Sequence, residues 1–506
     1  MEERQSERRV SKIAKRNQSG KAKQRKVLFA VGTILQLISV LLTLVVGYYL
    51  LRYGLLPTDK RMMALGVLAV IQLLVLLVHL GGVKRMGLRI FHMILSLILI
   101  AVMGLGAWYL HKGFSTLSLL NRNAKVQRVQ MLIMVKADSS LQALNELIDK
   151  RTVAPTGNDK ENIENFLKKI REEENITLKP AEVASYTDGL QEVVDSKADA
   201  AIVSQAYYHL IEAEKPELAS QVRILATASV AVEVEENPQV EENRTNQSTF
   251  NVYISGIDTY GPVGTVSRSD VNIVMTVNPT LKKILLTTVP RDSYVAIADG
   301  GGNQMDKLTH AGIYGVQASK HTLENLLNTR MDYYARINFS SLIQMVDVLG
   351  GVTVENPVAF STHDGAHFFQ AGNITLNGEQ ALAFSRERYN LPGGDGDRGK
   401  NQMRVIQGII NKAMSPEILT NYSGVLAAVS DSIETDMSTD QIINLVNIQL
   451  ASGSGWTTES NALTGYGQSG LPSAAMPGYS LYMMVLDEAS VEDAKARISN
   501  LLNATE

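Results

Sequence analysis

The chain has 506 residues, which is too long for one compact core, so several domains are expected. A formal net charge of -3 gives no whole-protein reason to expect nucleic acid as a partner. The absence of cysteine excludes disulfides, thiolate metal ligands and a cysteine nucleophile.

The N-terminal fifth of the chain has the composition of a membrane anchor. Residues 1–26 form a tail with ten Lys and Arg, followed by apolar segments at 27–50, 62–82 and 90–110. Each is long enough to cross a hydrocarbon core of about 30 Å. Because basic segments stay in the cytoplasm, we expect a multi-pass, three-span anchor (27–111) in the cell membrane, with everything after His111 outside the cell. His79 and His92 lie near span ends and are expected at the membrane interface.

Residues 120–235 are predicted to form a small accessory α/β domain, because strand-like and helix-like segments alternate there. Segment 126–135 is expected as a strand and 139–150 as a helix, and Asp159 is a candidate N-cap of the helix 160–174. No catalytic grouping is expected in this region. Residues 236–248 are acidic and polar and are predicted to be a linker, and 249–506 the catalytic domain.

Charged residues follow or precede three predicted strands of the main domain. Strand 250–257 ends at Asp258, strand 271–277 follows Arg268 and Asp270, and strand 283–289 ends before Arg291. Loop sites are usually built at strand ends, so we expect these side chains to cluster at one edge of a sheet.

Two later segments add more cationic residues. A helix opening at Asn377 leads to Arg386 and Arg388, which share a face if the chain is extended there. Asp397 is expected to cap a helix over 398–414, with Arg398 and Gln402 on one face. Further helices are predicted at 421–433 and 438–450, and the Gly-, Ser- and Pro-rich residues 453–478 are expected to be irregular.

Spacing alone leaves structural interpretations open. Asp258 and Asp270 are also typical of turns and caps, and Arg386-Glu387-Arg388 is also typical of a surface ion-pair cluster. For several other residues we expect structural roles. His310 is expected to form a structural hydrogen bond, His363 and His367 to lie in an exposed loop, and Val271, Ile273 and Met275 to lie in the core.

Six segments in order closely resemble the motifs of the LytR-CpsA-Psr family: GIDTYG…VSRSD, TVPRD, DKLTHAGIYG, INFSSLIQMVDVLGGV, LNGEQALAFSRERY and GDGDRGKNQ. The resemblance covers residues 249–415. The three spans and the accessory domain resemble the capsule-locus CpsA branch of streptococcal-like Gram-positive bacteria.

The resemblance implies an α/β/α fold whose central sheet encloses a hydrophobic channel for a polyprenyl chain. It implies Mg²⁺, with Mn²⁺ as a substitute, held by Asp258 and Asp270. The implied diphosphate clamp and its neighbours are Arg268, Arg291, Arg386, Arg388, Arg398 and Gln402, and Asp395 falls on a polar family position counted among the catalytic candidates. Gly396 stands where the family commonly has a second arginine, so one contact to the polymer or head group is absent here.

The implied activity is a phosphotransferase reaction that moves a glycopolymer, expected to be capsular polysaccharide, from undecaprenyl diphosphate to peptidoglycan. Membrane lipids and capsule-assembly membrane proteins are further expected partners, and nucleic acid is not. Two alternatives stay open: hydrolysis of a lipid or nucleotide diphosphate, and a non-enzymatic polyprenyl-phosphate-binding regulator of capsule synthesis. The sequence has no recognisable helix-turn-helix, which disfavours direct control of DNA.

Overall fold

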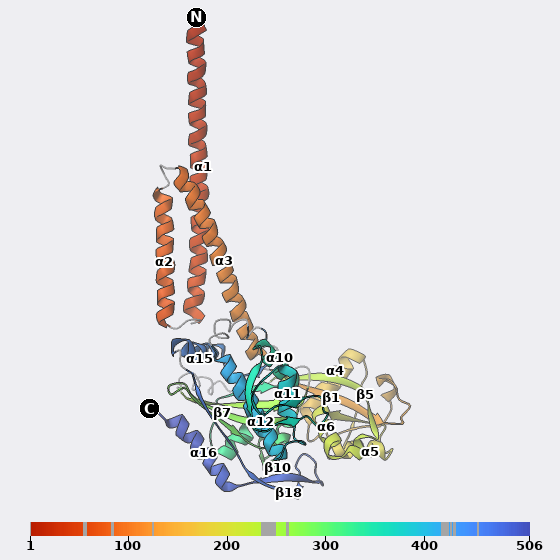
Figure 1. Cartoon of the computed structure of the whole chain (residues 1–506). Coiled ribbons are helices and arrows are strands. Elements are labelled where there is room, and N and C mark those ends of the chain that lie inside the picture. Colours follow the sequence, from red (N-terminus) through yellow and green to blue (C-terminus); the bar gives the residue numbers. More distant parts are fainter. Residues whose placement is uncertain are drawn as a thin grey trace. The chain divides into compact units, whose positions relative to one another are not determined.

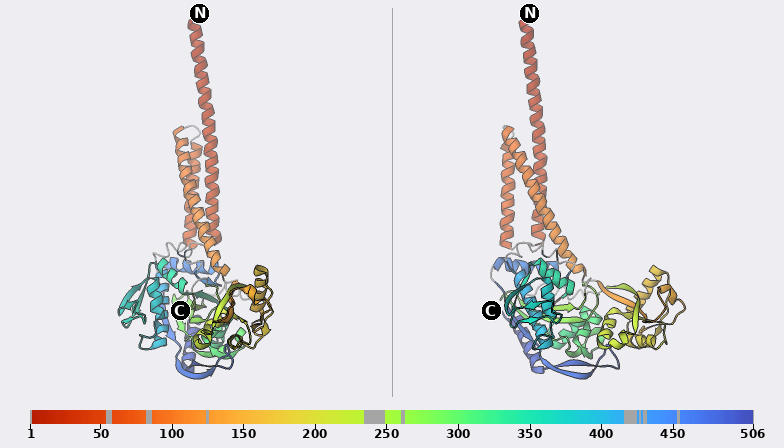
Figure 2. Two further views of the ribbon diagram at one scale, coloured as in Figure 1. Left: turned by 90° about the vertical axis from the view of Figure 1, so that its right-hand side faces the viewer. Right: turned by 45° about the vertical axis from the view of Figure 1, so that its right-hand side comes forward.

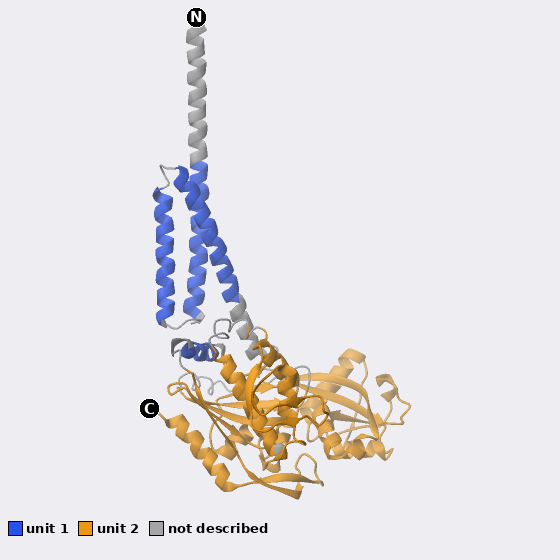
Figure 3. Ribbon diagram, viewed as in Figure 1, with its two compact units in different colours: residues 1–116, 440–453 blue, residues 117–439, 454–506 orange. Residues whose placement is uncertain are grey.

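The computed structural model describes residues 2–53, 58–81, 86–123, 126–233, 249–259, 263–415, 425, 428, 432–452 and 455–505. The predicted linker 236–248 and most of the predicted helix 421–433 lie outside these residues. The chain divides into two compact units, residues 1–116 with 440–453 and residues 117–439 with 454–506 (Figure 3).

The first unit contains the membrane anchor. Its N-terminal helices are α1 (Glu2–Tyr53), α2 (Thr58–Gly81) and α3 (Met86–Asn123), and most of α15 (Thr439–Ser452) belongs to the same unit. Among the described residues, three segments are helical, long and apolar enough to cross a membrane: Lys26–Arg52, Asp59–Gly81 and Met86–His111. The three-span prediction is confirmed.

A polar network lies between these three helices. His79 is 7% exposed and His92 is 1% exposed, so both side chains are buried among the helices, and their position at the membrane interface stays a prediction. The His92 ring nitrogen lies 3.0 Å from Gln36 Oε1, and Gln36 donates to Gln72 at 3.1 Å. Gly32 leaves room for the two histidine rings, since a Cβ there would lie 3.3 Å from His92. Polar side chains in apolar spans gain more from pairing with one another than from facing lipid.

The second unit begins with a mixed five-stranded sheet, in the order β3-β2-β4-β1-β5 (Figure 1). Its strands are β1 (Val126–Lys136), β2 (Thr152–Ala154), β3 (Ala181–Glu182), β4 (Ala200–Ser204) and β5 (Val222–Glu233). The helices are η1 (Leu144–Leu147), α4 (Lys160–Glu174), α5 (Tyr186–Val194), α6 (Gln205–Glu214) and α7 (Pro216–Ala219). They form a lobe of this unit that is visible at one side in both views of Figure 2.

The helix predicted at 139–150 is wrong, since only one short turn, η1, forms there. Arg223 donates to the carbonyl oxygens of Ser139 and Leu141, so these acceptors are engaged by a side chain instead of helical N–H groups. Asp149 then adopts a positive φ of 65°, which a right-handed helix cannot contain.

The main sheet of the second unit has six strands in the order β16-β11-β6-β7-β8-β17. They are β6 (Phe250–Ile257), β7 (Ser269–Asn278), β8 (Lys283–Thr288), β11 (Tyr333–Ile337), β16 (Glu434–Thr435) and β17 (Thr457–Ala462). β6, β7 and β8 pair antiparallel, whereas β11 and β17 lie parallel to β6 and β8. The sheet is therefore mixed.

Helices cover both faces of this sheet, because its central strands are apolar on both sides. Tyr253, Val274 and Leu285 pack with α9 (Val316–Leu327) and α16 (Glu488–Asn503). The neighbouring residues Ile254 and Ile273 point the other way and pack with α12 (Gly394–Ala413). The predicted α/β/α arrangement is confirmed (Figure 1).

Shorter elements complete the unit. The helical elements are η2 (Asp299–Gly301), η3 (Leu308–Tyr314), α10 (Phe339–Val348) and α11 (Gly378–Arg386). Two strand pairs are β9 (Tyr294–Ile297) with β10 (Gln304–Lys307) and β12 (Val352–Asn356) with β15 (Gly372–Leu376). Two more are β13 (Phe360–Ser361) with β14 (Phe368–Phe369) and β18 (Gly465–Pro472) with β19 (Ser480–Leu486). β17 and β18 lie within 453–478, so the expectation of irregular structure there is wrong. Their backbones pair with β8 and β19, and this pairing outweighs their weak strand propensity.

Candidate functional site

A pocket of about 420 Å³ lies at the edge of the main sheet where β6 ends and β7 begins. We call it the arginine pocket. Its charged and amide lining residues are Asp258, Asp270, Arg291, Arg386, Arg388, Arg398 and Gln402, and its apolar lining includes Ile257, Val271, Ile337, Phe339, Leu342 and Leu382. The expected clustering of charged strand ends is therefore observed.

Asp258 follows β6 and is paired with Arg268, which precedes β7. Arg268 Nη2 donates to Asp258 Oδ2 at 2.6 Å, and Ser267 Oγ donates to Asp258 Oδ1 at 3.1 Å. The two charged side chains are 15% and 16% exposed, so the pair is largely shielded from water. Arg268 Nε is buried and has no hydrogen-bond partner among the described residues.

A second pair repeats this arrangement one strand further. Arg291, which follows β8, donates through Nη1 to Asp270 Oδ2 at 2.6 Å. Thr309, on η3, donates to the other oxygen of Asp270 at 3.1 Å. Asp258 and Asp270 thus each form an ion pair with an arginine, and both line the same pocket. Their contacts go beyond the turn or cap role that was an open alternative from the sequence.

Arg386 and Arg388 enter the pocket from the end of α11. The Arg386 guanidinium lies 4.5 Å from the centre of the Phe339 ring, and that of Arg388 lies 4.6 Å from the Tyr389 ring. Arg388 Nη2 also donates to the Tyr389 hydroxyl at 2.5 Å. Aromatic faces hold a guanidinium in place without neutralising its charge. Both arginines stay available for an anion.

Glu387 lies between these arginines but pairs with backbone instead of cations. Its carboxylate accepts N–H groups from His363 at 2.6 Å, Asn390 at 2.9 Å and Arg388 at 3.0 Å. Burial raises the pKa of Glu387, but these hydrogen bonds outweigh it and hold the pKa below its usual value. Glu387 therefore fixes the loop that presents both arginines, and the surface ion-pair interpretation of the segment is wrong.

The N-terminal turns of α12 carry Arg398 and Gln402, and both line the arginine pocket as their spacing predicts. The helix begins at Gly394, four residues before the predicted start, so Asp397 is not its N-cap. Instead the Asp397 carboxylate accepts the Gly393 N–H at 2.8 Å and the Lys400 ammonium at 2.8 Å. The side chain of Asp395 lies outside the described part of the structure.

Three contacts at the site were missed from sequence: Thr309 on Asp270, and the rings under Arg386 and Arg388. Thr309 lies in the family-like segment DKLTHAGIYG and Phe339 in INFSSLIQMVDVLGGV. Their position in these segments was the sequence signal that could have identified them as site residues. η3 packs closely on the site, since a Cβ at Gly312 would lie 2.4 Å from the Ser267 carbonyl oxygen.

The histidines of this unit lie in structural contacts. His310 Nδ1 lies 2.8 Å from Asp306 Oδ1, and both side chains are 1% exposed, which confirms the predicted hydrogen-bonding role. The His363 ring packs on Tyr389, with ring centres 4.7 Å apart. The His367 ring stacks on Phe369 with centres 6.0 Å apart.

Within the described residues, no group of three or more His, Asp or Glu side chains has the arrangement of a metal site. The arginine pocket has two carboxylates, those of Asp258 and Asp270. One or two carboxylates with substrate phosphate oxygens and water are what Mg²⁺ commonly takes. The donor set therefore fits a magnesium ion that arrives with a phosphate ligand.

The fold and pocket define a class of protein: a membrane-anchored α/β/α domain with an arginine–carboxylate site. The LytR_cpsA_psr family model matches residues 219–489, more than half of the chain, and the chain belongs to this family. A second model, DNA polymerase processivity factor, matches residues 84–203. That match covers less than a quarter of the chain and includes the whole third apolar segment, Met86–His111.

Relatives agree with this assignment. The chain is 42% identical over 212 residues to "Polyisoprenyl-teichoic acid--peptidoglycan teichoic acid transferase TagU" of Enterococcus faecalis, covering 41% of this chain and 68% of that protein. It is 33% identical over 283 residues to the protein of the same name from Bacillus licheniformis, covering 54% and 87%. Among solved structures, B. subtilis TagV is 25% identical and aligns over 52% of this chain and 100% of that chain, with a TM-score of 0.44.

Proposed function

We propose that this protein transfers a glycopolymer, expected to be capsular polysaccharide, from an undecaprenyl diphosphate carrier to peptidoglycan. The observation that carries the proposal is the arginine pocket, which gathers Arg291, Arg386, Arg388 and Arg398 around two carboxylates. The relatives named as teichoic acid transferases act on a polyisoprenyl-linked glycopolymer and peptidoglycan, which supports the same reaction class here.

The pocket has the chemistry that a lipid diphosphate requires. Guanidinium groups keep their charge and bind phosphate oxygens through paired N–H groups. Arg386 and Arg388 are held by aromatic rings, and apart from the Arg388 Nη2 bond to Tyr389 their guanidinium groups can donate to a ligand. Arg268 Nε, buried and without an acceptor among the described residues, is a further donor that a phosphate oxygen would satisfy.

The same pocket offers apolar surface next to its charged groups. Val271, Phe339 and Leu342 line it together with the arginines. A polyprenyl diphosphate has this combination of charge and hydrocarbon, whereas a nucleotide diphosphate does not. The hydrophobic channel expected from the family resemblance would continue from this wall, past the apolar cluster of Ile273 and Met403.

We propose that Mg²⁺ bound by Asp258 and Asp270 neutralises part of the diphosphate charge. Each carboxylate is now paired with an arginine. When the diphosphate and the ion enter together, Arg268 and Arg291 would turn from the carboxylates to phosphate oxygens. The exchange keeps every charge paired, so it avoids the cost of a buried single charge.

In the proposed reaction a sugar hydroxyl of peptidoglycan attacks the phosphorus that carries the polymer. A new phosphorus–oxygen bond forms, the bond to the bridging oxygen breaks, and undecaprenyl phosphate leaves, while the hydroxyl proton passes to solvent. Phosphoryl transfer depends mainly on positioning and on neutralising charge on the phosphate oxygens. Arg386 and Arg388 supply the positive charge, and Glu387 keeps them in position.

This function requires the second unit to face the cell wall. The basic tail 1–26 and an odd number of spans support a cytoplasmic N-terminus and an extracellular C-terminal region. A membrane anchor would also keep the protein at the bilayer from which the undecaprenyl carrier is taken.

The test uses the full-length protein in lipid nanodiscs with a lipid-diphosphate oligosaccharide, Mg²⁺ and uncrosslinked peptidoglycan. Saccharide covalently joined to glycan by the wild type, and lost in Arg386→Ala, would support the transferase. Release of free sugar phosphate without joined product would indicate a hydrolase. Tight lipid binding with neither product would indicate the regulator.

A further inference from the structure

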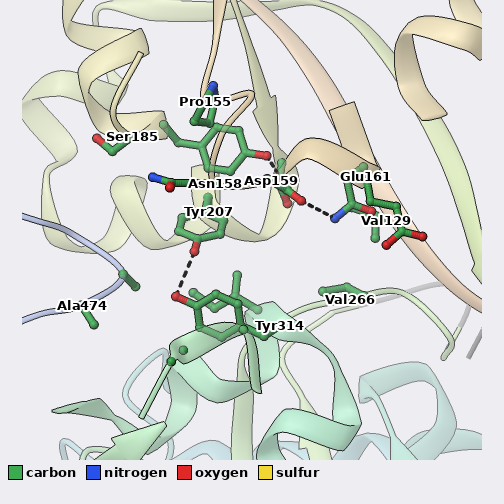
Figure 4. Close-up of a pocket in the computed structure, with 18 of the residues that line it drawn as sticks. Val129, Pro155, Asn158, Asp159, Glu161, Ser185, Tyr207, Val266, Tyr314 and Ala474 are labelled. Atoms are coloured by element: carbon green, nitrogen blue, oxygen red, sulfur yellow. Dashed lines mark hydrogen bonds between the residues drawn. The ribbon is translucent and has the colours of Figure 1, made fainter. Parts of the chain in front are cut away.

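A second cavity, of about 550 Å³, lies within the second unit between the accessory sheet and loops of the main domain. We call it the junction pocket (Figure 4). From the accessory region its walls include Gln127, Asn158, Asp159, Glu161, Tyr186 and Tyr207. From the main domain they include Val266, Gly300, Gln304, Tyr314, Ala474 and Pro477.

The two sides of this pocket are joined by direct bonds. Tyr207 donates its hydroxyl to the Tyr314 hydroxyl at 3.1 Å, as Figure 4 shows. Lys307 on the main-domain side donates to Glu214 of α6 at 2.6 Å. The backbone of Arg128 pairs with residues 264–266 through two hydrogen bonds of 2.9 Å. These contacts connect the two sides of the pocket directly.

The third wall, formed by residues 474–477, is also anchored. Asp306 accepts hydrogen bonds from the Ser473 hydroxyl at 3.0 Å and from the Ala475 N–H at 2.7 Å. His310 Nδ1 lies 2.8 Å from Oδ1 of the same carboxylate. The buried His310–Asp306 pair, which the arginine pocket does not use, thus positions a wall of the junction pocket.

The lining chemistry differs from that of the arginine pocket. Among the described residues that line the junction pocket there is no Lys, Arg or His, whereas Asp159 and Glu161 contribute two carboxylates. An anionic group such as a diphosphate is therefore disfavoured here. A neutral ligand rich in hydroxyl groups suits the lining, which has many amide, carboxylate and phenol groups.

Three tyrosines supply aromatic surface, and one of them, Tyr314, supplies a hydroxyl donor. The Tyr186 and Tyr207 rings lie with centres 4.8 Å apart, and the Tyr207 and Tyr314 rings with centres 6.4 Å apart. Burial raises the pKa of each of the three hydroxyl groups, so they stay protonated, and Tyr186 and Tyr207 donate their protons to Asp159 and Tyr314. Because the Tyr314 hydroxyl accepts from Tyr207, its own proton is directed to another acceptor.

Carboxylate oxygens in this pocket can accept from sugar hydroxyls. Asp159 accepts from Tyr186 and, at 2.8 Å, from Asn162, and these two bonds fix its orientation. The Glu161 carboxylate is exposed and has no ion-pair partner among the described residues. A fixed carboxylate beside amide groups and ring faces is a combination that can bind the hydroxyls and the apolar C–H face of a pyranose.

The junction pocket and the arginine pocket share structural elements. Val266 lines the junction pocket, and Arg268, two residues later, pairs with Asp258 of the arginine pocket. η3 connects the same two sites, with Thr309 bonded to Asp270 and Tyr314 lining the junction pocket. At a rise of about 2 Å per residue, the five steps from Thr309 to Tyr314 span about 10 Å.

We propose that the junction pocket is a saccharide-binding site that takes neutral pyranose units of a glycan chain. Its role in aligning a sugar chain with the diphosphate rests on the proposed transferase function, whereas saccharide binding itself does not. The sugar could come from the glycan strand of peptidoglycan or from the transferred polymer, since both present ring hydroxyls.

The test measures binding of oligosaccharides to the full-length protein in nanodiscs by calorimetry and by saturation-transfer NMR. A tetramer of N-acetylglucosamine represents the glycan strand, cellotetraose represents neutral polymer sugars, and inorganic diphosphate is the anionic probe. Ala474→Trp fills the pocket without removing a side-chain hydrogen bond. Tyr314→Phe removes one hydroxyl and keeps the ring. Tyr208→Phe makes the same change on α6 at a residue outside the lining.

We expect an oligosaccharide to bind the wild type and Tyr208→Phe with equal affinity. The affinity of Ala474→Trp should be lower by a factor of about ten or more, and that of Tyr314→Phe by a factor of about five. Whichever tetramer binds more tightly identifies the source of the sugar. Binding of neither tetramer, or equal binding to a folded Ala474→Trp variant, would overturn the proposal. Binding of inorganic diphosphate that weakens in Ala474→Trp would overturn it as well, because the pocket would then take an anion.

The Arg386→Ala variant separates this proposal from the transferase. It should bind oligosaccharide as the wild type does, because Arg386 lies outside the junction pocket. If saccharide binds but no transfer is found in any variant, the saccharide site stands and the transferase fails. If transfer proceeds but Ala474→Trp leaves saccharide binding unchanged, the saccharide site fails alone.

Discussion

Replacing Glu387 with Gln tests whether this carboxylate holds the two arginines in place. In the wild type the carboxylate accepts three backbone N–H groups, from His363, Arg388 and Asn390. An amide oxygen can replace only one carboxylate oxygen, so the amide NH₂ would face an N–H donor. One buried donor then loses its acceptor, and the remaining bonds lose the assistance of a charge.

The structure gives a magnitude for this change. A buried unsatisfied donor costs about 2 kcal/mol, and two charge-assisted bonds that become neutral lose together about 1 kcal/mol more. Local opening of the loop should therefore become about 3 kcal/mol easier, which corresponds to roughly a hundredfold faster amide exchange. Since a misplacement of about 1 Å can reduce turnover about a hundredfold, transfer should fall by a similar factor.

Hydrogen–deuterium exchange of residues 361–390 in nanodiscs measures the loop directly, with Glu379→Gln as the control. Glu379 is exposed at the start of α11, the helix that Glu387 follows, so its replacement should change neither amide exchange nor transfer. Unchanged exchange in Glu387→Gln would refute the clamping role.

The pH dependence has a defined sign. The pKa of Glu387 is below that of an unfolded Glu, about 4.3, so its stabilisation is present above that pH and is lost as the pH falls through the lower folded value. The difference between wild type and Glu387→Gln should therefore be full at pH 7 and shrink below about pH 4.3. A difference that grew in acid would contradict this assignment.

Three further predictions concern separate parts of the second unit. Arg336→Ala should destabilise this unit by about 3–5 kcal/mol in chemical unfolding, because the Glu434 carboxylate would be left charged and fully buried. A loss of stability below about 1 kcal/mol would contradict this role of the ion pair. Gly312→Ala should cost at least about 1–3 kcal/mol and lower transfer, since its Cβ would meet the Ser267 backbone at 2.4 Å; wild-type stability and activity would refute this. Chelation of divalent ions should abolish transfer and be reversed by Mg²⁺, and Asp270→Asn should need more Mg²⁺ for half-maximal rate; full activity in chelator would exclude the metal.

Local patterns predicted the elements that position the site. The apolar run 250–257 became β6 with the predicted bounds, and its end places Asp258 at the pocket. Arg398 and Gln402 are on one helix face because a four-residue spacing determines this in any helix. Such features depend on periodicity within one segment, which a sequence displays directly.

Features that depend on distant partners were not predictable in this way. Residues 457–462 form β17 because β8 lies beside them, although Glu459, Asn461 and Ala462 have low strand propensity. His79 and His92 are buried because three helices bring Gln36 and Thr33 to their rings. The junction pocket likewise arises from contacts between segments more than 100 residues apart, such as that of Tyr207 with Tyr314.

The measurement that tests the central claim most directly compares transfer by the wild type, Arg386→Ala and Arg497→Ala in the nanodisc assay. Arg497 forms an exposed ion pair with Asp493 on α16, so its replacement controls for the loss of one arginine. We predict saccharide–peptidoglycan product from the wild type and Arg497→Ala, and a loss of about a hundredfold or more in Arg386→Ala. Wild-type levels of product from a folded Arg386→Ala variant would contradict the assignment of the arginine pocket as the transfer site.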